Sequence, residues 1–242
     1  MAPAYIFSSG FMRLLFLAGL FWLICCLPAF AADRGASFFP APIGRHESAG
    51  ALPQWKRILD QAAQEEDFYL QCQKAPQECP SLRIAVWQKF ITTLQNVPEK
   101  DRILAVNNWF NLLPYRQDNW VYGKKDHWAT MVEFLDFSGD CEDFAIAKYL
   151  TLKQLGVSPE AMRIAMVYDI YSGTDHAFLV INFEGDELIL DNREDTVDRR
   201  EFARRYKPHF AFNEETVWTY DSPLMVRTMR GNDGESVLAG NR

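Results

Sequence analysis

The feature that most constrains the fold is a stretch, residues 142–155, whose apolar side chains are spread around every side of a helix. Gly156 and Pro159 follow it, as expected where a helix ends. A helix that is apolar on nearly every side must be covered on nearly every side. We therefore expect it to lie in the middle of a domain. Its apolar residues are Phe144, Ala145, Ile146, Ala147, Tyr149, Leu150, Leu152 and Leu155.

The hydrophobic pattern differs on the two sides of this helix. Before it, apolar stripes at helical spacing predict further helices. After it, period-two and β-branched patterns predict strands joined by turns at 172–175 and 184–187. Helices first and an antiparallel meander afterwards indicate the α+β class. The stripes span 55–62, 82–97 and 103–113, and the strands span 163–171, 176–183, a run ending at 190–192, and 216–220.

The first 31 residues have the three parts of a secretory signal peptide. A basic segment ends at Arg13, an apolar stretch covers 14–27, and Ala29-Phe30-Ala31 fits a cleavage site. We predict export and cleavage after this site. The alternative is a retained N-terminal anchor, although the apolar stretch is short for a membrane span of about 20 residues.

The remaining chain is predicted to hold one domain. Residues 32–50 are interpreted as a flexible lead-in, 51–225 as the functional domain, and 226–242 as a loose tail. Without the signal peptide, the chain has 24 Lys and Arg against 32 Asp and Glu, a net charge of −8. This acidic balance argues against nucleic-acid binding.

The cysteines divide into three groups. Cys25 and Cys26 lie within the signal peptide, and Cys72 and Cys79 bracket a short polar segment. An oxidising compartment would allow Cys72 and Cys79 to form a disulfide. Cys141 would then be left alone, and its surroundings must decide whether it is an apolar filler or a reactive thiol.

Cys141 stands where a helix is predicted to begin. Ser138 and Gly139 form a turn pair, and Asp140 is a plausible N-cap, so Cys141 falls in the first helical turn. The positive end of the helix dipole favours a thiolate there, and the free backbone N–H groups could receive an oxyanion. The alternative is a structural cysteine at a helix start.

His176 and Asp191 are the predicted partners of the thiol. His176 opens a strand directly after a turn, and Asp191 ends the strand that pairs with it. Because the ends of an antiparallel hairpin lie side by side, Asp191 is expected to meet His176 across the two strands. A carboxylate there would fix the imidazole tautomer and stabilise the imidazolium. The alternative for His176 is an ordinary turn residue.

Several motifs resemble those of the bacterial transglutaminase-like cysteine proteinases, whose best-known members are LapG-type periplasmic proteases. They span about residues 80–200, and Asp140-Cys141-Glu142-Asp143 is the most specific of them. The others are Phe144 to Tyr149, Leu155-Gly156-Val157, His176-Ala177, Leu190-Asp191-Asn192, Asp118-Asn119-Trp120, Asp126 to Thr130 and Phe134-Leu135.

The resemblance implies a papain-like catalytic domain in which Cys141, His176 and Asp191 form the triad of a periplasmic endopeptidase. It also implies a calcium ion bound beside the nucleophile. A large cell-surface adhesin as the substrate, with a role in biofilm attachment, and control by an inner-membrane cyclic-di-GMP receptor follow only from the resemblance.

The acidic residues around the nucleophile also favour a bound cation. Asp140, Glu142 and Asp143 oppose a thiolate, each by roughly 3 kcal/mol at ~6 Å and an effective dielectric constant of about 20. The helix dipole returns only about 0.3 to 1 kcal/mol. Oxygen ligands suit Ca²⁺, so we predict a calcium site with Asp140 and Glu142 as the preferred ligands and Asp143 as a third candidate. The alternative is that these acids are solvated cap residues.

Two other functions are compatible with the same residues. A transglutaminase-like or arylamine-acetyltransferase-like enzyme would pass the acyl group to an amine and form an amide product, whereas a protease releases free termini. A catalytically inactive binding module would not react with a thiol-directed activity probe.

Overall fold

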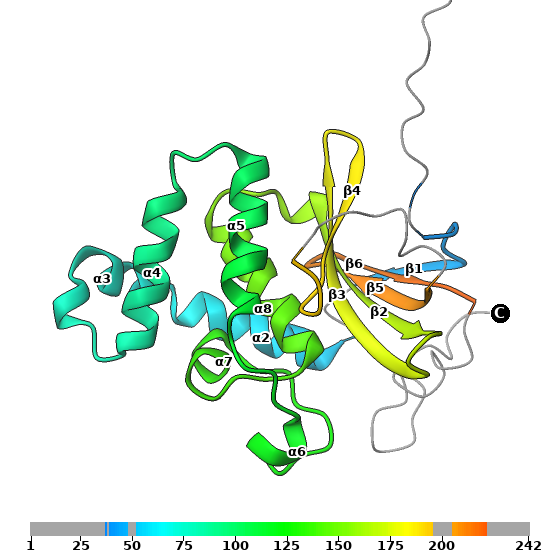
Figure 1. Cartoon of the computed structure of the whole chain (residues 1–242), viewed down its shortest axis with the longest axis horizontal. Helices are drawn as coiled ribbons and strands as arrows, with labels where there is room; N and C mark the ends of the chain where they lie inside the picture. The colour runs from blue at the N-terminus through cyan, green and yellow to red at the C-terminus, as the bar shows by residue number, and fades with distance from the viewer. Residues whose placement is uncertain (1–36, 38, 48–51, 196–204, 222–242) are drawn as a thin grey trace, which may run out of the picture. The chain divides into compact units, whose positions relative to one another are not determined.

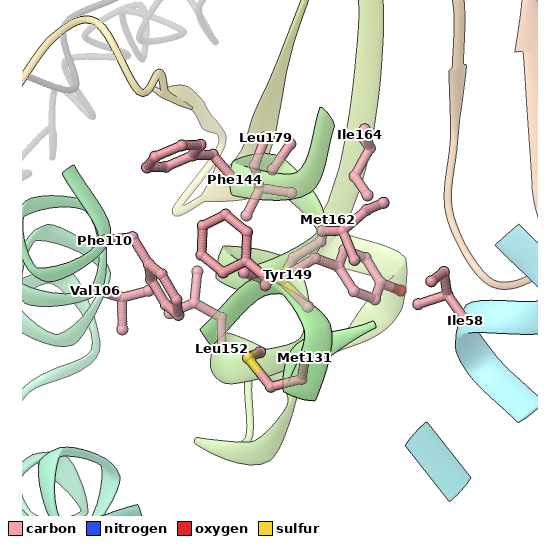
Figure 2. Packing of buried hydrophobic residues seen from close by; sticks show 14 of the residues in the cluster. Ile58, Val106, Phe110, Met131, Phe144, Tyr149, Leu152, Met162, Ile164 and Leu179 are labelled. Atoms are coloured by element: carbon pink, nitrogen blue, oxygen red, sulfur yellow. The ribbon is translucent and has the colours of Figure 1, made fainter. Parts of the chain in front are cut away.

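The computed structural model describes residues 37, 39–47, 52–195 and 205–221. Helix α8 (Cys141–Gln154) lies between the other helices and the sheet (Figure 1), which confirms its predicted central position. Its side chains pack against α5 (Glu99–Asn111) on one side and β2 (Met162–Asp169) on another (Figure 2). Phe144, Tyr149 and Leu152 of α8 are all buried in this core.

The other helices precede α8 in the chain (Figure 1). The three predicted stripes correspond to α2, α4 and α5, whereas α3, α6 and α7 lie in the region predicted to be helical but had no assigned stripe. No helix within the described ranges is long and apolar enough to span a membrane. The bounds are α2 Pro53–Gln64, α3 Glu66–Lys74, α4 Leu82–Leu94, α6 Asp118–Val121 and α7 Met131–Phe137, with 3-10 turns at η1 Pro76–Glu78 and η2 Pro159–Ala161.

A disulfide joins Cys72, near the end of α3, to Cys79, just before α4. This confirms the predicted pairing. Cys141 is the free cysteine of the part of the chain that the structure describes.

The strands form one antiparallel six-stranded sheet in the order β1-β6-β5-β2-β3-β4, and the helices lie on one side of it (Figure 1). This arrangement confirms the α+β class. The remaining bounds are β1 Gly44–Glu47, β3 Thr174–Phe183, β4 Asp186–Leu190, β5 Tyr206–Phe212 and β6 Thr216–Thr219.

The prediction of a flexible lead-in is wrong for part of residues 32–50. Gly44–Glu47 forms strand β1 and pairs with β6, and Phe39 is buried against Phe178 and Tyr220. Arg163 covers the Phe39 ring. Strand pairing and one buried aromatic ring therefore order a segment that has no hydrophobic period of its own. The predicted signal peptide and tail lie outside the described residues.

Candidate active site

A tight turn delivers Cys141 to the beginning of α8. Asp140 is the N-cap residue, as predicted, and its N–H donates to Asp143 Oδ2 at 3.1 Å. A Cβ atom at Gly139 would lie 1.9 Å from the same Oδ2, so only glycine allows this close approach. Ser138 has φ 66° and ψ −173°, a strained conformation for a residue other than glycine, and its Oγ donates to Pro114 O at 2.5 Å.

His176 and Asp191 form the contact that the sequence predicted. The distance from His176 Nε2 to Asp191 Oδ1 is 2.9 Å, and both residues are buried. Leu179 of β3 pairs with Leu190 of β4. Because the two strands are antiparallel, the next residue, Asp191, lies beside Phe178. His176 lies two residues from Phe178 on the same face, and Asp191 therefore reaches it diagonally.

Asp191 is held by further donors besides His176. Oδ1 also accepts from Arg193 N at 3.0 Å, and Oδ2 accepts from Tyr206 Oη at 3.0 Å. Burial alone would raise the pKa of Asp191, but the hydrogen bond and charge of His176, with the two other donors, hold that pKa below its usual value. Asp191 is thus a carboxylate fixed in place beside the imidazole.

The orientation of His176 leaves Nδ1 available for the thiol. Nε2 is taken by Asp191, and Nδ1 has no hydrogen-bond partner within the described ranges. The backbone N–H of Ala177, the next residue, faces the Cys141 thiol and acts to lower its pKa. The structure therefore brings all three predicted residues, Cys141, His176 and Asp191, to one place between the start of α8 and strands β3 and β4.

The thiol itself is held in its neutral form. Cys141 is half-buried, and its Sγ donates to Glu142 Oε2 at 3.2 Å. Burial raises the pKa of Cys141 well above its ordinary value, and the charges of Glu142 and Asp140 raise it further. The Ala177 N–H acts in the opposite direction but does not prevail. The helix start therefore does not suffice to lower this pKa, as the predicted charge conflict implies.

Carboxylates gather beside the thiol from two parts of the chain. Ligand atoms of Asp118, Asp126 and Glu142 lie within 4.8 Å of one another, and those of Asp118, Asp140 and Asp143 form a second such group. Asp118 Oδ1 and Asp140 Oδ1 are buried and have no partner among the residues described. Unpartnered oxygens of this kind fit a hard cation such as Ca²⁺.

The raised pKa values of the acidic cluster also favour a bound cation. Burial, together with the hydrogen bond and charge of Glu142, raises the pKa of Asp140 to about 10. Burial raises the pKa of Glu142 to about 7, and the charge of Asp143 adds to this effect. Without a countercharge, these acids cannot all ionise at neutral pH.

The predicted ligand candidates Asp140, Glu142 and Asp143 all lie in these groups, and two further carboxylates join them. Asp143 belongs to one group, but its Oδ1 and Oδ2 already accept from Ala129 N at 2.6 Å and from Asp140 N at 3.1 Å, so it mainly ties two loops together. Asp118 and Asp126 received no role from the sequence, although both stand in motifs that carry the resemblance. Only the fold shows that they approach Glu142.

The two tryptophans of those motifs have different environments. Trp128 is buried and stacks on Phe212 with ring centroids 5.2 Å apart, so it packs in the core. Trp120 on α6 is 84% exposed.

A thiol at a helix start beside a buried His–Asp pair, on an α+β fold, defines the class of papain-like and transglutaminase-like cysteine enzymes. The chain belongs to the bacterial transglutaminase-like cysteine proteinase family, whose sequence model matches residues 58–220. It is therefore a cysteine protease.

Solved structures of one relative are similar to the described fold. Calcium-bound LapG of Legionella pneumophila is 32% identical, with a TM-score of 0.56 over 64% of this chain and 88% of that one. EGTA-treated LapG from the same organism is also 32% identical, with a TM-score of 0.55 over 63% of this chain and 86% of that one. The search of curated proteins found no match.

Proposed function

We propose that this protein is a calcium-dependent periplasmic endopeptidase in which Cys141 is the nucleophile, His176 the general base and Asp191 the residue that orients His176. The observation that carries the proposal is the buried 2.9 Å contact between His176 and Asp191 beside the Cys141 sulfur. A fixed tautomer with a free Nδ1 is what proton removal from the thiol requires.

The residues of this site support acyl transfer to water. His176 Nδ1 takes the Cys141 proton, and the sulfur attacks the carbonyl carbon of a peptide bond. The backbone N–H groups at the start of α8 can receive the oxyanion. His176 then gives its proton to the leaving amine, which departs and leaves a thioester on Cys141. Finally, His176 removes a proton from water, which hydrolyses the thioester, and the free thiol is restored.

The calcium proposal rests on the carboxylates around Cys141. Asp140 and Glu142 are the proposed ligands from the start of α8, and Asp118 of α6 and Asp126 of the loop after α6 are the proposed ligands from the preceding segment. A bound Ca²⁺ would compensate the carboxylate charges that now raise the pKa of the thiol. The calcium-bound structure of LapG, at 32% identity, supports this proposal.

The proposed substrate is a large cell-surface adhesin whose cleavage controls biofilm attachment, and the proposed regulator is an inner-membrane cyclic-di-GMP receptor. Both proposals, like the periplasmic location, are supported by the likeness to LapG and by the predicted signal peptide.

The test is to incubate the purified protein with the secreted surface proteins of its own organism and to sequence the new termini. We expect one or a few cleavage positions in a single large protein. Cys141→Ala and His176→Ala should abolish cleavage while circular dichroism stays unchanged. A calcium-selective chelator should stop cleavage, and added Ca²⁺ should restore it. A new amide product in place of free termini would contradict proteolysis, and full turnover by Cys141→Ala would contradict the proposed nucleophile.

A further inference from the structure

Lys148 is a fully buried lysine in the middle of α8, about two turns beyond the nucleophile. An ammonium group is costly to bury unless its donors are satisfied. Its Nζ donates to Asn107 Oδ1 and to Asn111 Oδ1, both at 2.8 Å. Burial lowers the pKa of Lys148 to about 7, while the charges of Asp191 and Asp195 act to raise it. The triad and the acidic cluster do not use this residue.

Lys148 determines which way the two amides of α5 face. A protonated lysine offers donors only, so the oxygens of both asparagines must turn toward it. Their Nδ2 atoms then face the segment that follows β4. Asn107 Nδ2 donates to Glu194 O at 3.0 Å, and Asn111 Nδ2 donates to Glu194 O at 3.1 Å.

The same amide reaches the residue that orients the catalytic base. Asn111 Nδ2 donates to the backbone oxygen of Asp191 at 3.0 Å. Asp191 is therefore held at two points, by its carboxylate at His176 and by its main chain at Asn111. An unbroken series of hydrogen bonds thus connects Lys148 to His176.

We propose that Lys148 is a positioning residue, which fixes the amides of Asn107 and Asn111 so that they hold the main chain at Asp191 and thereby align His176 with Cys141. This inference rests on the catalytic roles proposed above. Within the described residues no hydrogen bond or ion pair joins Lys148 to the sulfur or the imidazole, so it acts through Asp191.

The main test compares Lys148→Met with Lys153→Met. Methionine keeps the apolar stem and removes the donors, and Lys153 is an exposed lysine of the same helix that pairs with the half-buried Glu214 at 2.7 Å. The readouts are the rate at which iodoacetamide alkylates Cys141, located by mass spectrometry, and kcat and KM. Because a small misalignment costs up to about a hundredfold in rate, we expect Lys148→Met to slow alkylation and kcat about ten- to a hundredfold, with KM little changed. Lys153→Met should leave both rates unchanged.

A double-mutant cycle separates positioning from general loss of structure. Since Lys148 acts through Asp191, adding Lys148→Met to Asp191→Ala should slow alkylation no further. If the double variant is slowed by the product of the two single effects on the alkylation rate, the proposal is overturned. If Lys148→Met loses its near-ultraviolet circular dichroism and so its tertiary structure, Asn111→Ala is the variant that tests the proposal. Slower alkylation of Asn111→Ala supports the proposal, and an unchanged rate overturns it. Alkylation needs no substrate, so these results stand even if the proposed adhesin is wrong.

Discussion

Asp169 and Asp140 are both withdrawn from water, but the protein treats them in opposite ways. Asp169 is fully buried and accepts from Arg205 Nε at 2.9 Å, Arg205 Nη2 at 2.8 Å and Arg193 Nη1 at 3.1 Å. The hydrogen bond from Arg205 lowers the pKa of Asp169 despite burial. Asp140 has a buried oxygen without a partner in the described part of the chain, and its pKa is raised to about 10 by burial and by Glu142.

The difference shows where each countercharge comes from. Asp169 receives its cations from the chain itself, so its site is complete once the protein has folded. The cluster around Asp140 collects carboxylate oxygens, and within the described residues no ion pair joins Asp140 or Glu142 to a basic side chain; Lys124 acts on Asp118 only by its charge. The carboxylate cluster around Asp140 is stable with all its groups ionised only when a positive charge is added. This requirement is the physical basis of the calcium proposal.

The largest expected effect separates the two carboxylates by function. Asp140→Asn should weaken calcium binding by more than about a hundredfold and abolish cleavage, because even partners of metal ligands contribute 10- to 100-fold. Asp169→Asn should leave the calcium affinity per folded molecule unchanged. Calorimetric titration of both variants checks this, and equal losses of affinity would remove the distinction.

The next effect concerns stability. Asp169→Asn should lower the free energy of unfolding by about 3 kcal/mol, because it leaves two arginines without their buried partner. Urea denaturation measures this. The control is Asp60→Asn, which breaks an exposed pair with Lys56 and should change stability by less than about 0.5 kcal/mol. A loss of the same size in both variants would show that the buried ion pairs of Asp169 stabilise the fold no more than an exposed ion pair does.

The pH dependence of stability should have opposite signs in the two regions. In metal-free protein the pKa of Glu142 is raised from 4.5 to about 7, so the folded state holds a proton that the unfolded state releases. Stability is therefore lost as the pH rises from about 4.5 to 7, on the order of 3 kcal/mol for this group. Asp169, with its lowered pKa, contributes stability that is lost only in acid.

Thermal denaturation of metal-free wild type and Glu142→Gln across this range checks the sign. The wild type should lose stability relative to Glu142→Gln as the pH rises, and Ca²⁺ should reverse the difference, because the variant lacks a proposed ligand. A constant difference between the two proteins in the absence of metal would contradict the raised pKa.

The smallest expected effect is a gain in stability. In metal-free protein at neutral pH, Asp140→Asn should raise the free energy of unfolding by about 1 kcal/mol, because an amide is cheaper to bury than an acid that ionises on unfolding. The same substitution in the presence of Ca²⁺ should instead lower stability. Urea denaturation with and without Ca²⁺ measures both signs, and the same sign under both conditions would contradict the metal-site interpretation.

The sequence predicted those parts of the molecule that depend on local pattern. The apolar helix 141–154, the hairpin that joins His176 to Asp191, and the disulfide between Cys72 and Cys79 all follow from periodicity, turns and short separations. Each needs only residues that are near in sequence or aligned by one hairpin.

The remaining features depend on contacts between distant segments. Strand β5 lies in a region without a clear alternating pattern, and its pairing with β2 determines its conformation. Asp118 and Asp126 reach Glu142 only because the loops before α7 fold back onto the start of α8. In the sequence, Lys148 is one of few polar residues on an apolar helix, and the pattern predicts no partner for it. Its contacts with Asn107 and Asn111 depend on the packing of α5 against α8.

Strand β1 has a consequence for the topology of the domain. Among the strands of the described residues it comes first in sequence, yet it pairs with β6, which comes last, and Ile43 N also donates to Thr219 O at 2.8 Å. The points where the chain enters and leaves the sheet are therefore neighbours in space. A domain of this kind can be inserted into a loop of another protein, or circularly permuted by joining these ends and opening an exposed turn, without changing the order of its strands.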